Sequence, residues 1–177
     1  MNTFNNKRRR ETVKRIESVF LEELKTNELS RIKVSDICKN AQINRSTFYA
    51  NFIDVYDLAD KILARLKEEV STLLKNDIDL QKSEEGFLNL LRHIKENQSL
   101  YSFYFKLGYD RKEDFSICDF SVESYGFDKD LIKYHIVFFK NGFNAIINEW
   151  LKVGCKETPE QIRDIIFYEY RGRLMGE

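Results

Sequence analysis

The chain has 177 residues, of which 42% are hydrophobic and 33% are charged, and its 29 basic residues balance its 29 acidic ones. This length suits one domain, or a small domain joined to a larger one, with enough apolar residues for a packed core. No apolar run is long enough to span a bilayer, and the polar N-terminus lacks the apolar core of a secretion signal. The three cysteines, Cys38, Cys118 and Cys155, are too widely spaced for a disulfide framework or a zinc site. The composition therefore predicts a cytoplasmic protein with reduced thiols.

The balanced charge is unevenly distributed along the chain. Residues 1–53 hold 11 Lys and Arg against 6 Asp and Glu, whereas residues 54–177 hold 18 against 23. A basic head on an acidic body suggests that the head meets a polyanion. Chance clustering is the alternative, because residues 7–10 alone supply four positive charges. These four residues are expected to form either a mobile basic arm that neutralises phosphates or a plain disordered terminus.

The first part of the chain predicts a series of helices. Apolar residues recur at helical spacing over 8–26 and, for a shorter stretch, over 34–41. A third helix is expected at 45–51, and Asp54 can cap a longer fourth helix over 54–76.

The expected helix at 45–51 combines a polar face with two apolar anchors, and Asn44 is well placed to cap its start. Phe48 and Phe52 are four residues apart, so they would point together into the core and fix the angle of the helix. Two short helices joined by a tight turn form a helix-turn-helix, whose second helix enters the major groove of DNA. The polar side chains available for that contact are Arg45, Ser46, Thr47, Tyr49 and Asn51.

The C-terminal part is also expected to be helical. An aromatic-rich helix over 100–107 should stop at Gly108, and the strongest apolar stripe, over 130–153, is followed by Gly154 as a helix-ending residue. The next segment, Thr-Pro-Glu-Gln, is typical of a capping box and should start a last helix over 159–172. No strand is expected. The predicted fold class is all-α, with a three-helix helix-turn-helix head, a C-terminal helical bundle and about nine helices in total.

Residues 32–58, IKVSDICKNAQINRSTFYANFIDVYDL, resemble the DNA-binding head of TetR/AcrR-type transcriptional regulators. The resemblance extends over residues 1–75, while the remainder resembles the family only in its helical pattern and its strong penultimate helix. The shared positions include an Ile-or-Val start to the second helix and then Ala41, Ile43, Thr47, Phe48, Tyr49, Phe52, Asp54 and Leu58.

This resemblance implies a homodimeric, sequence-specific DNA-binding regulator, usually a repressor that leaves a palindromic operator when a small molecule enters the C-terminal domain. Residues 1–53 would be the DNA-binding domain and residues 54–177 the effector-binding and dimerisation domain, connected by the helix over 54–76. The residues expected to approach DNA, by position in the family's motif, are Lys33, Ser35, Asn44, Arg45, Ser46, Thr47, Tyr49, Asn51 and Tyr56.

Several positions depart from the family's pattern. Gln42 stands where the turn usually has glycine, and a positive φ there would cost a non-glycine residue about 1 kcal/mol. Lys33 replaces the usual threonine cap of the second helix, and Val55 replaces a lysine that often opens the fourth, so Tyr56 would have to supply that phosphate contact. Asn51 stands where the family often has a phosphate-contacting histidine, and it can donate a hydrogen bond but no charge.

Aromatic residues of the C-terminal part are expected to be either core or the lining of an effector pocket between helices. A pocket for a small apolar or aromatic effector would be lined by Tyr101, Tyr104, Phe105, Phe120, Tyr125, Tyr134 and Phe138.

The helix over 130–153 has more apolar surface than one partner helix can cover, which predicts a two-fold interface with a second copy. The alternative is that both of its faces are buried within one chain. The expected interface residues are Phe138, Gly142, Ala145, Glu149, Ile162, Ile166 and Phe167.

No catalytic site, metal or cofactor is expected. The chain has no glycine-rich phosphate loop and no Gly-x-Ser-x-Gly or His-Glu-x-x-His motif, and His93 and His135 lack partners at metal spacing. The main alternative to a ligand-responsive DNA-binding dimer is a helical regulator, activator or adaptor, that acts through a protein partner without an effector pocket. A closed C-terminal core would favour that alternative, and a cavity of several hundred cubic ångströms would favour the first hypothesis.

Overall fold

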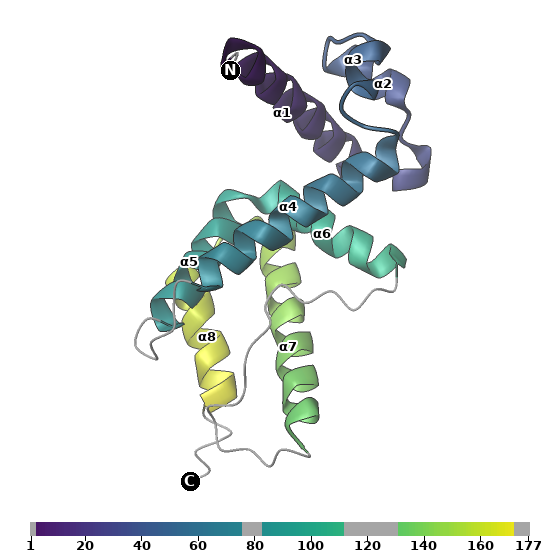
Figure 1. Ribbon diagram of the computed structural model, residues 1–177. Coiled ribbons are helices and arrows are strands. Elements are labelled where there is room, and N and C mark those ends of the chain that lie inside the picture. Colours follow the sequence, from purple (N-terminus) through teal and green to yellow (C-terminus); the bar gives the residue numbers. More distant parts are fainter. Residues whose placement is uncertain (1–2, 76–82, 112–130, 172–177) are drawn as a thin grey trace. The chain divides into compact units, whose positions relative to one another are not determined.

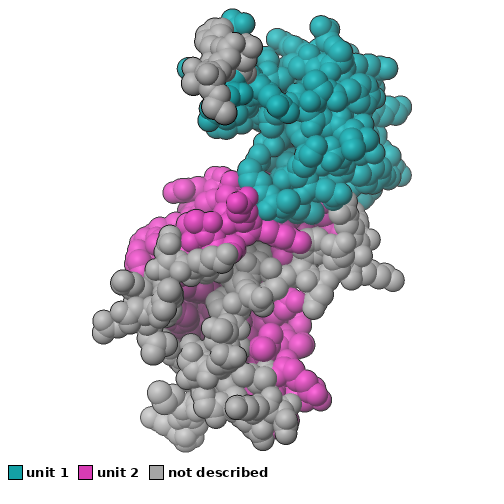
Figure 2. Space-filling model, viewed as in Figure 1, with its two compact units in different colours: residues 1–66 teal, residues 67–177 magenta. Residues whose placement is uncertain are grey.

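The computed structural model describes residues 3–75, 83–111 and 131–171. Within these ranges the chain forms eight α-helices and one 3-10 helix and has no strand (Figure 1). The all-α fold class predicted from the sequence is therefore confirmed. The chain divides into two compact units, Met1–Leu66 and Lys67–Glu177 (Figure 2). This division falls within the fourth helix, whereas the boundary expected from the sequence precedes that helix.

Unit 1 is built around the first helices of the chain. Its elements are α1 (Thr3–Thr26), η1 (Leu29–Arg31), α2 (Val34–Asn40), α3 (Arg45–Tyr49) and the first part of α4 (Val55–Lys75). Helix α1 packs against α2, and α2 packs against α3. Apolar residues from all four α-helices form the core, and its fully buried members include Ile16, Phe20, Ile37, Phe48 and Leu58.

Helix α1 is longer than the sequence pattern indicated. Residues 7–10 lie inside it, so the expectation of a mobile basic arm at these positions is wrong. The segment contains no glycine or proline to interrupt a helix. The four positive charges of residues 7–10 are therefore held on a helix.

The end of α2 is a Schellman motif, and it forms the turn of the helix-turn-helix. The backbone N–H of Ile43 donates to the carbonyl of Cys38 at 3.0 Å, and that of Gln42 donates to the carbonyl of Lys39 at 3.2 Å. This pattern needs a left-handed residue directly after the C-cap. Gln42 has a φ of 53°, so the non-glycine residue in the turn carries the strain that the sequence analysis considered.

Helices α3 and α4 are capped differently at their N-termini. The carboxylate Oδ1 of Asp54 accepts hydrogen bonds from the backbone N–H groups of Tyr56 and Asp57, each at 2.8 Å, which confirms Asp54 as the cap of α4. Asn44 occupies the N-cap position of α3 but makes no side-chain capping bond. Its role as a side-chain cap was predicted wrongly, because its backbone carbonyl alone closes the first turn by accepting the N–H of Thr47 at 3.0 Å.

Unit 2 contains the remaining helices. They are the rest of α4, α5 (Ser83–Glu96), α6 (Gln98–Arg111), α7 (Ile132–Lys152) and α8 (Pro159–Arg171). Helix α5 packs against α6 and α8, and α6 packs against α7. Helix α6 continues through Gly108, where the sequence analysis expected it to stop. A glycine lowers helix propensity by about 1 kcal/mol but does not by itself end a helix. No helix in the described part of the chain has the length and apolar character needed to cross a bilayer.

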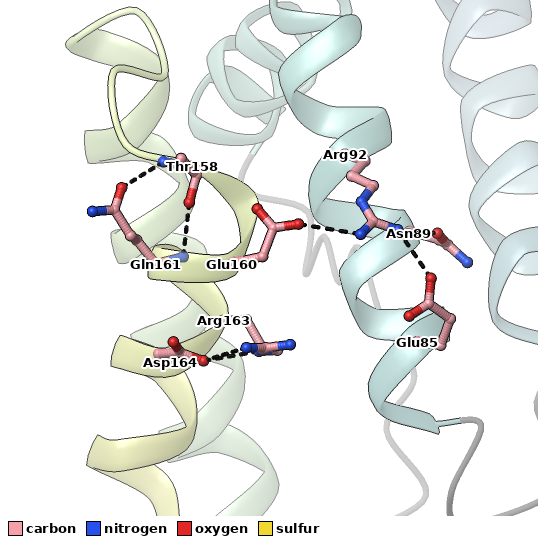
Figure 3. Close-up of polar contacts among 8 residues, drawn as sticks. All are labelled: Glu85, Asn89, Arg92, Thr158, Glu160, Gln161, Arg163 and Asp164. Atoms are coloured by element: carbon pink, nitrogen blue, oxygen red, sulfur yellow. Dashed lines mark hydrogen bonds and ion pairs between the residues drawn. The ribbon is translucent and has the colours of Figure 1, made fainter.

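The connection between α7 and α8 follows the sequence prediction closely. Gly154 has a φ of 75° and donates its N–H to Leu151, while Cys155 donates to Trp150 at 2.8 Å, a second Schellman motif. Thr158 and Gln161 then form a reciprocal capping box (Figure 3), with bonds of 2.8 and 3.2 Å between each backbone N–H and the other's side-chain oxygen. Both of these expectations are confirmed.

Polar and aromatic contacts hold α5 against α8. The guanidinium of Arg92 donates to Glu85 at 2.9 Å on its own helix and to Glu160 at 3.1 Å on α8 (Figure 3). The rings of Phe87 and Phe167 stack with centroids 5.4 Å apart. One helix pair in unit 2 is thus joined by both an ion-pair network and an aromatic stack.

Candidate nucleic-acid interface

Helix α3 has one buried and one exposed face. Phe48 is 0% exposed and Phe52 is 4% exposed, and their ring centroids lie 5.5 Å apart in the core of unit 1. Arg45 and Ser46 are exposed, and Tyr49 is 57% exposed. The helix spans Arg45–Tyr49 and is shorter than expected, but the anchored, two-faced character that the sequence indicated is present.

The other predicted DNA contacts lie at the start of α2 and around the ends of α3. Lys33 is exposed at the N-cap of α2 and makes no side-chain cap, and Ser35 is half-buried in the first turn. Asn44 is exposed immediately before α3, and Tyr56 is 46% exposed in the first turn of α4. Thr47 is half-buried.

Asn51 is engaged by other parts of unit 1. Its Oδ1 accepts a hydrogen bond from Arg9 Nε at 2.9 Å, and its Nδ2 donates to the carbonyl of Thr47 at 2.8 Å. Its backbone carbonyl accepts from Lys61 Nζ at 3.0 Å. These contacts occupy Oδ1 and one of the two N–H groups of the Asn51 amide, so a contact with a phosphate would use the other N–H. The sequence did not point to Arg9, because it stands 42 residues away and no local spacing relates the two positions.

The charges beside α3 affect two titratable groups. A hydrogen bond from Lys61 at 2.8 Å, reinforced by the backbone N–H of Ile53 at 2.9 Å, lowers the pKa of Asp57. Burial raises the pKa of the Cys38 thiol, and the positive charge of Arg45 opposes that rise. Cys38 is therefore held as a neutral, buried thiol next to a cationic helix start.

The predicted effector-pocket residues in the described part of the chain differ in exposure. Tyr101, Tyr104 and Phe105 are buried in α6, whereas Tyr134 and Phe138 of α7 are 63% and 60% exposed. The Tyr101 hydroxyl lies 2.8 Å from Nδ1 of His93. Two further predicted pocket residues, Phe120 and Tyr125, lie outside the described residues.

An open surface groove with a volume of about 400 Å³ lies between α6 and α7. Of the predicted pocket residues, Phe105 lines it. Its other lining residues were not predicted from the sequence, because most of them are lysine, serine or asparagine, which usually face solvent on a helix. The full lining is Ser102, Phe105, Lys106, Asn148, Leu151 and Lys152.

The predicted interface residues fall into two groups. Phe138, Gly142, Ala145 and Glu149 are exposed along α7. A Cβ added at Gly142 would meet no atom of this chain within 4 Å.

The second group, on α8, belongs to the core of the subunit. Ile162 and Ile166 are 4% and 3% exposed, and Phe167 stacks on Phe87 of α5. They face α5 because α8 turns its apolar stripe inward, so we leave them out of the interface proposed below. Other large apolar side chains are exposed on these two helices and were not predicted as interface residues, namely Val137, Ile165 and Tyr168.

Comparison with known proteins decides the family. Residues 81–168 match the family model TetR_C_8, described as "Transcriptional regulator C-terminal region". The chain belongs to the TetR family of transcriptional regulators. The match covers the part of the chain in which the sequence resemblance was weakest, while the helix-turn-helix residues carry the resemblance at the other end. The expectation that the chain is a regulator and not an enzyme is confirmed by its relatives.

One curated relative is a named operon regulator. This chain is 32% identical over 90 residues to the HTH-type dhaKLM operon transcriptional activator DhaS of Lactococcus lactis subsp. lactis (strain IL1403). That match spans 51% of this chain and 46% of the relative, so less than half of the relative's length is covered.

Solved structures of TetR-type proteins share the fold over nearly the whole chain. The dihydroxyacetone kinase operon activator DhaS matches with a TM-score of 0.57 at 22% identity, covering 93% of this chain and 96% of its own. A TetR transcriptional regulator from Streptococcus agalactiae 2603V matches with a TM-score of 0.60 at 19% identity, covering 96% and 99%. At these identities the likeness shows the fold.

Proposed function

We propose that this TetR-family chain is a homodimeric regulator that inserts α3 into the major groove of a palindromic DNA site. The observation that carries the proposal is the form of α3, a short helix anchored by Phe48 and Phe52 with Arg45, Ser46 and Tyr49 on its open face. Side chains near the start of such a helix are the ones that reach base edges, and Arg45 can bond a guanine in two places. Lys33, Ser35, Asn44 and Tyr56 are proposed as flanking contacts.

Selection of bound duplexes from a random pool tests this proposal. A two-fold-symmetric sequence with half-sites about one helical turn apart or somewhat more is the expected result. Recovery of no preferred sequence would contradict the proposal, and recovery of a single asymmetric half-site would contradict the dimer.

The homodimer is supported by the exposed face of α7. Large apolar side chains such as Val137 and Phe138 are exposed to solvent on this face, which also carries the small residues Gly142 and Ala145. The open space around Gly142 would allow another helix to approach closely. A second copy is the occupant that the two-fold symmetry of a palindromic site requires.

A small-molecule effector remains part of the proposal, and the open groove between α6 and α7 is its candidate site. Its volume of about 400 Å³ suits a small ligand. The side chains of Lys106 and Lys152 and the polar groups of Ser102 and Asn148 favour an anion with a short apolar part, because Phe105 supplies an apolar surface. This differs from the apolar or aromatic effector expected from the sequence. Thermal unfolding of the protein with a panel of small carboxylates and phosphate esters tests it, and the absence of any shift across the panel would favour the partner-dependent alternative.

The direction of regulation has two candidates. The resemblance to the family predicts a repressor acting in the cytoplasm. The relative that is 32% identical is named an operon activator, which supports an activator. A reporter that carries the selected site decides between them: deletion of the regulator raises expression for a repressor and lowers it for an activator.

A further inference from the structure

The segment after α3 is tied to two other helices of unit 1. Arg9 of α1 donates from Nε to Oδ1 of Asn51 at 2.9 Å, and Lys61 of α4 donates from Nζ to the backbone carbonyl of the same residue at 3.0 Å. Asn51 then donates from Nδ2 to the carbonyl of Thr47 inside α3 at 2.8 Å. One side chain therefore links α1 to the last turn of the candidate recognition helix.

The amide of Asn51 fits this link in one orientation. Its oxygen faces a guanidinium N–H and its nitrogen faces a carbonyl. Exchanging the two ends of the amide would place donor against donor at Arg9 and acceptor against acceptor at Thr47. Lys61 strengthens the same region, because its Nζ lies 2.8 Å from the carboxylate of Asp57 and 5.3 Å from the centroid of the Phe52 ring.

A helix as short as α3 cannot keep its direction by itself. Arg45–Tyr49 is barely more than one turn, and such a segment gains its stability from the contacts around it. Phe48 holds its inner face, and the bonds to Asn51 hold its C-terminal end. A change in either support would tilt the side chains that meet the bases.

We propose that Arg9 is a positioning residue: through Asn51 it fixes the C-terminal end of α3 against α1 and so sets sequence specificity without reading a base. This inference rests on the proposed DNA-binding function. It differs from a role in which Arg9 neutralises a phosphate, because the directional N–H of Nε matters in the first case and the charge matters in the second.

Two variants separate these roles. Arg9→Gln removes the charge but keeps an N–H donor at the position of Nε, because both atoms follow Cδ. Arg9→Met removes the charge and the donor at similar length. The dissociation constant is measured for each variant on the selected duplex and on a duplex of unrelated sequence, over a range of salt concentrations.

The expected result is a difference between the two variants on the selected duplex alone. Arg9→Met should bind that duplex about fivefold more weakly than Arg9→Gln, the size expected from one hydrogen bond, and both should bind the unrelated duplex equally. Equal affinities of the two variants on the selected duplex would overturn the proposal. An equal loss on both duplexes with a shallower salt dependence would identify Arg9 as a phosphate contact.

Arg10 provides the matched control. Its Nε donates to the carbonyl of Asn6 in its own helix at 3.3 Å, so Arg10→Gln and Arg10→Met should not differ in specificity. Amide hydrogen exchange of Asn51 and Phe52 in the protein without DNA gives a separate readout. Exchange should be faster in Arg9→Met than in Arg9→Gln, and identical rates would overturn the proposal. A parent protein that prefers no duplex would instead overturn the DNA-binding function, while the exchange comparison would still decide the role of Arg9.

Discussion

Glu17 and Arg65 form a two-point ion pair that joins α1 to the first part of α4 within unit 1. Nη1 of Arg65 lies 2.7 Å from Oε1 of Glu17, and Nη2 lies 2.8 Å from Oε2. Glu17 is 7% exposed, so its carboxylate depends on this partner for much of the stabilisation that water would otherwise give. Parallel contacts of this kind fix direction as well as distance.

Arg65→Met should therefore destabilise the protein. Leaving a buried carboxylate without its charged partner costs about 1–3 kcal/mol in the free energy of unfolding, measured by denaturant titration. The exposed pair of Lys25 and Glu22, 2.6 Å apart, supplies the control, and Lys25→Met should change the free energy by about 0.5 kcal/mol or less. Equal effects of the two substitutions would show that burial of Glu17 does not matter.

Arg45→Ala should weaken binding to the selected duplex and relax the preference at one base position. A two-point contact with a base contributes about 1–3 kcal/mol to discrimination. Competition binding with single-position variants of the site measures it at matched salt. An Arg45→Ala protein with the parent's affinity and preferences would show that α3 does not lie in the groove as proposed.

Gln42→Gly should raise the free energy of unfolding by about 0.5–1 kcal/mol, because glycine adopts the left-handed conformation without strain. The gain is limited because glycine loses more conformational entropy on folding. Gln42→Ala keeps the strain, so it should remain within a few tenths of a kcal/mol of the parent. The measurement is the denaturant midpoint at constant slope. A glycine variant no more stable than the alanine variant would argue against strain at the φ of 53°.

Ala145→Arg should give monomers that keep a helical spectrum and bind the palindromic duplex much more weakly. A bulky charge at the proposed close approach of two α7 helices prevents them from meeting. Sedimentation at micromolar concentration measures the assembly. Ala64→Arg places the same charge at another exposed alanine and should leave the assembly unchanged. A parent that is already monomeric at this concentration would contradict the dimer and the palindrome together.

The stability supplied by Asp57 should depend on pH. Because the pKa of its carboxyl is lowered by Lys61 and by the N–H of Ile53, its contribution is present above the unfolded pKa of about 4 and is lost as pH falls through the lower folded value. The stability difference between the parent and Asp57→Asn should be constant near neutral pH and shrink below about pH 4. A difference that grew on acidification would have the wrong sign.

Local chemistry explains which parts of the fold were predictable. The cap at Asp54, the capping box of Thr158 and Gln161, and the ending at Gly154 each depend on residues a few positions apart, so the sequence displays them directly. The bond between Arg9 and Asn51 joins residues 42 positions apart, so no local spacing in the sequence displays it.

The solvent exposure of apolar side chains on α7 and α8 could not be predicted from the helical spacing of apolar residues. Ile162 of α8 and Phe138 of α7 both belong to apolar patterns, yet one is 4% exposed and the other 60%. An apolar stripe shows that a surface must be covered, but not whether this chain or a second copy covers it. The interface prediction therefore included core residues such as Ile162 and omitted the exposed Tyr168.

The connection between α7 and α8 has a consequence for how the chain acquires its structure. Its two Schellman bonds, its capping box and the bond from Trp150 Nε1 to the carbonyl of Glu157 join residues no more than seven positions apart. Such contacts close small loops at little entropic cost and form on the microsecond timescale. We expect this connection to form early, so that substitutions at Gly154 or Thr158 would slow folding more than they would speed unfolding.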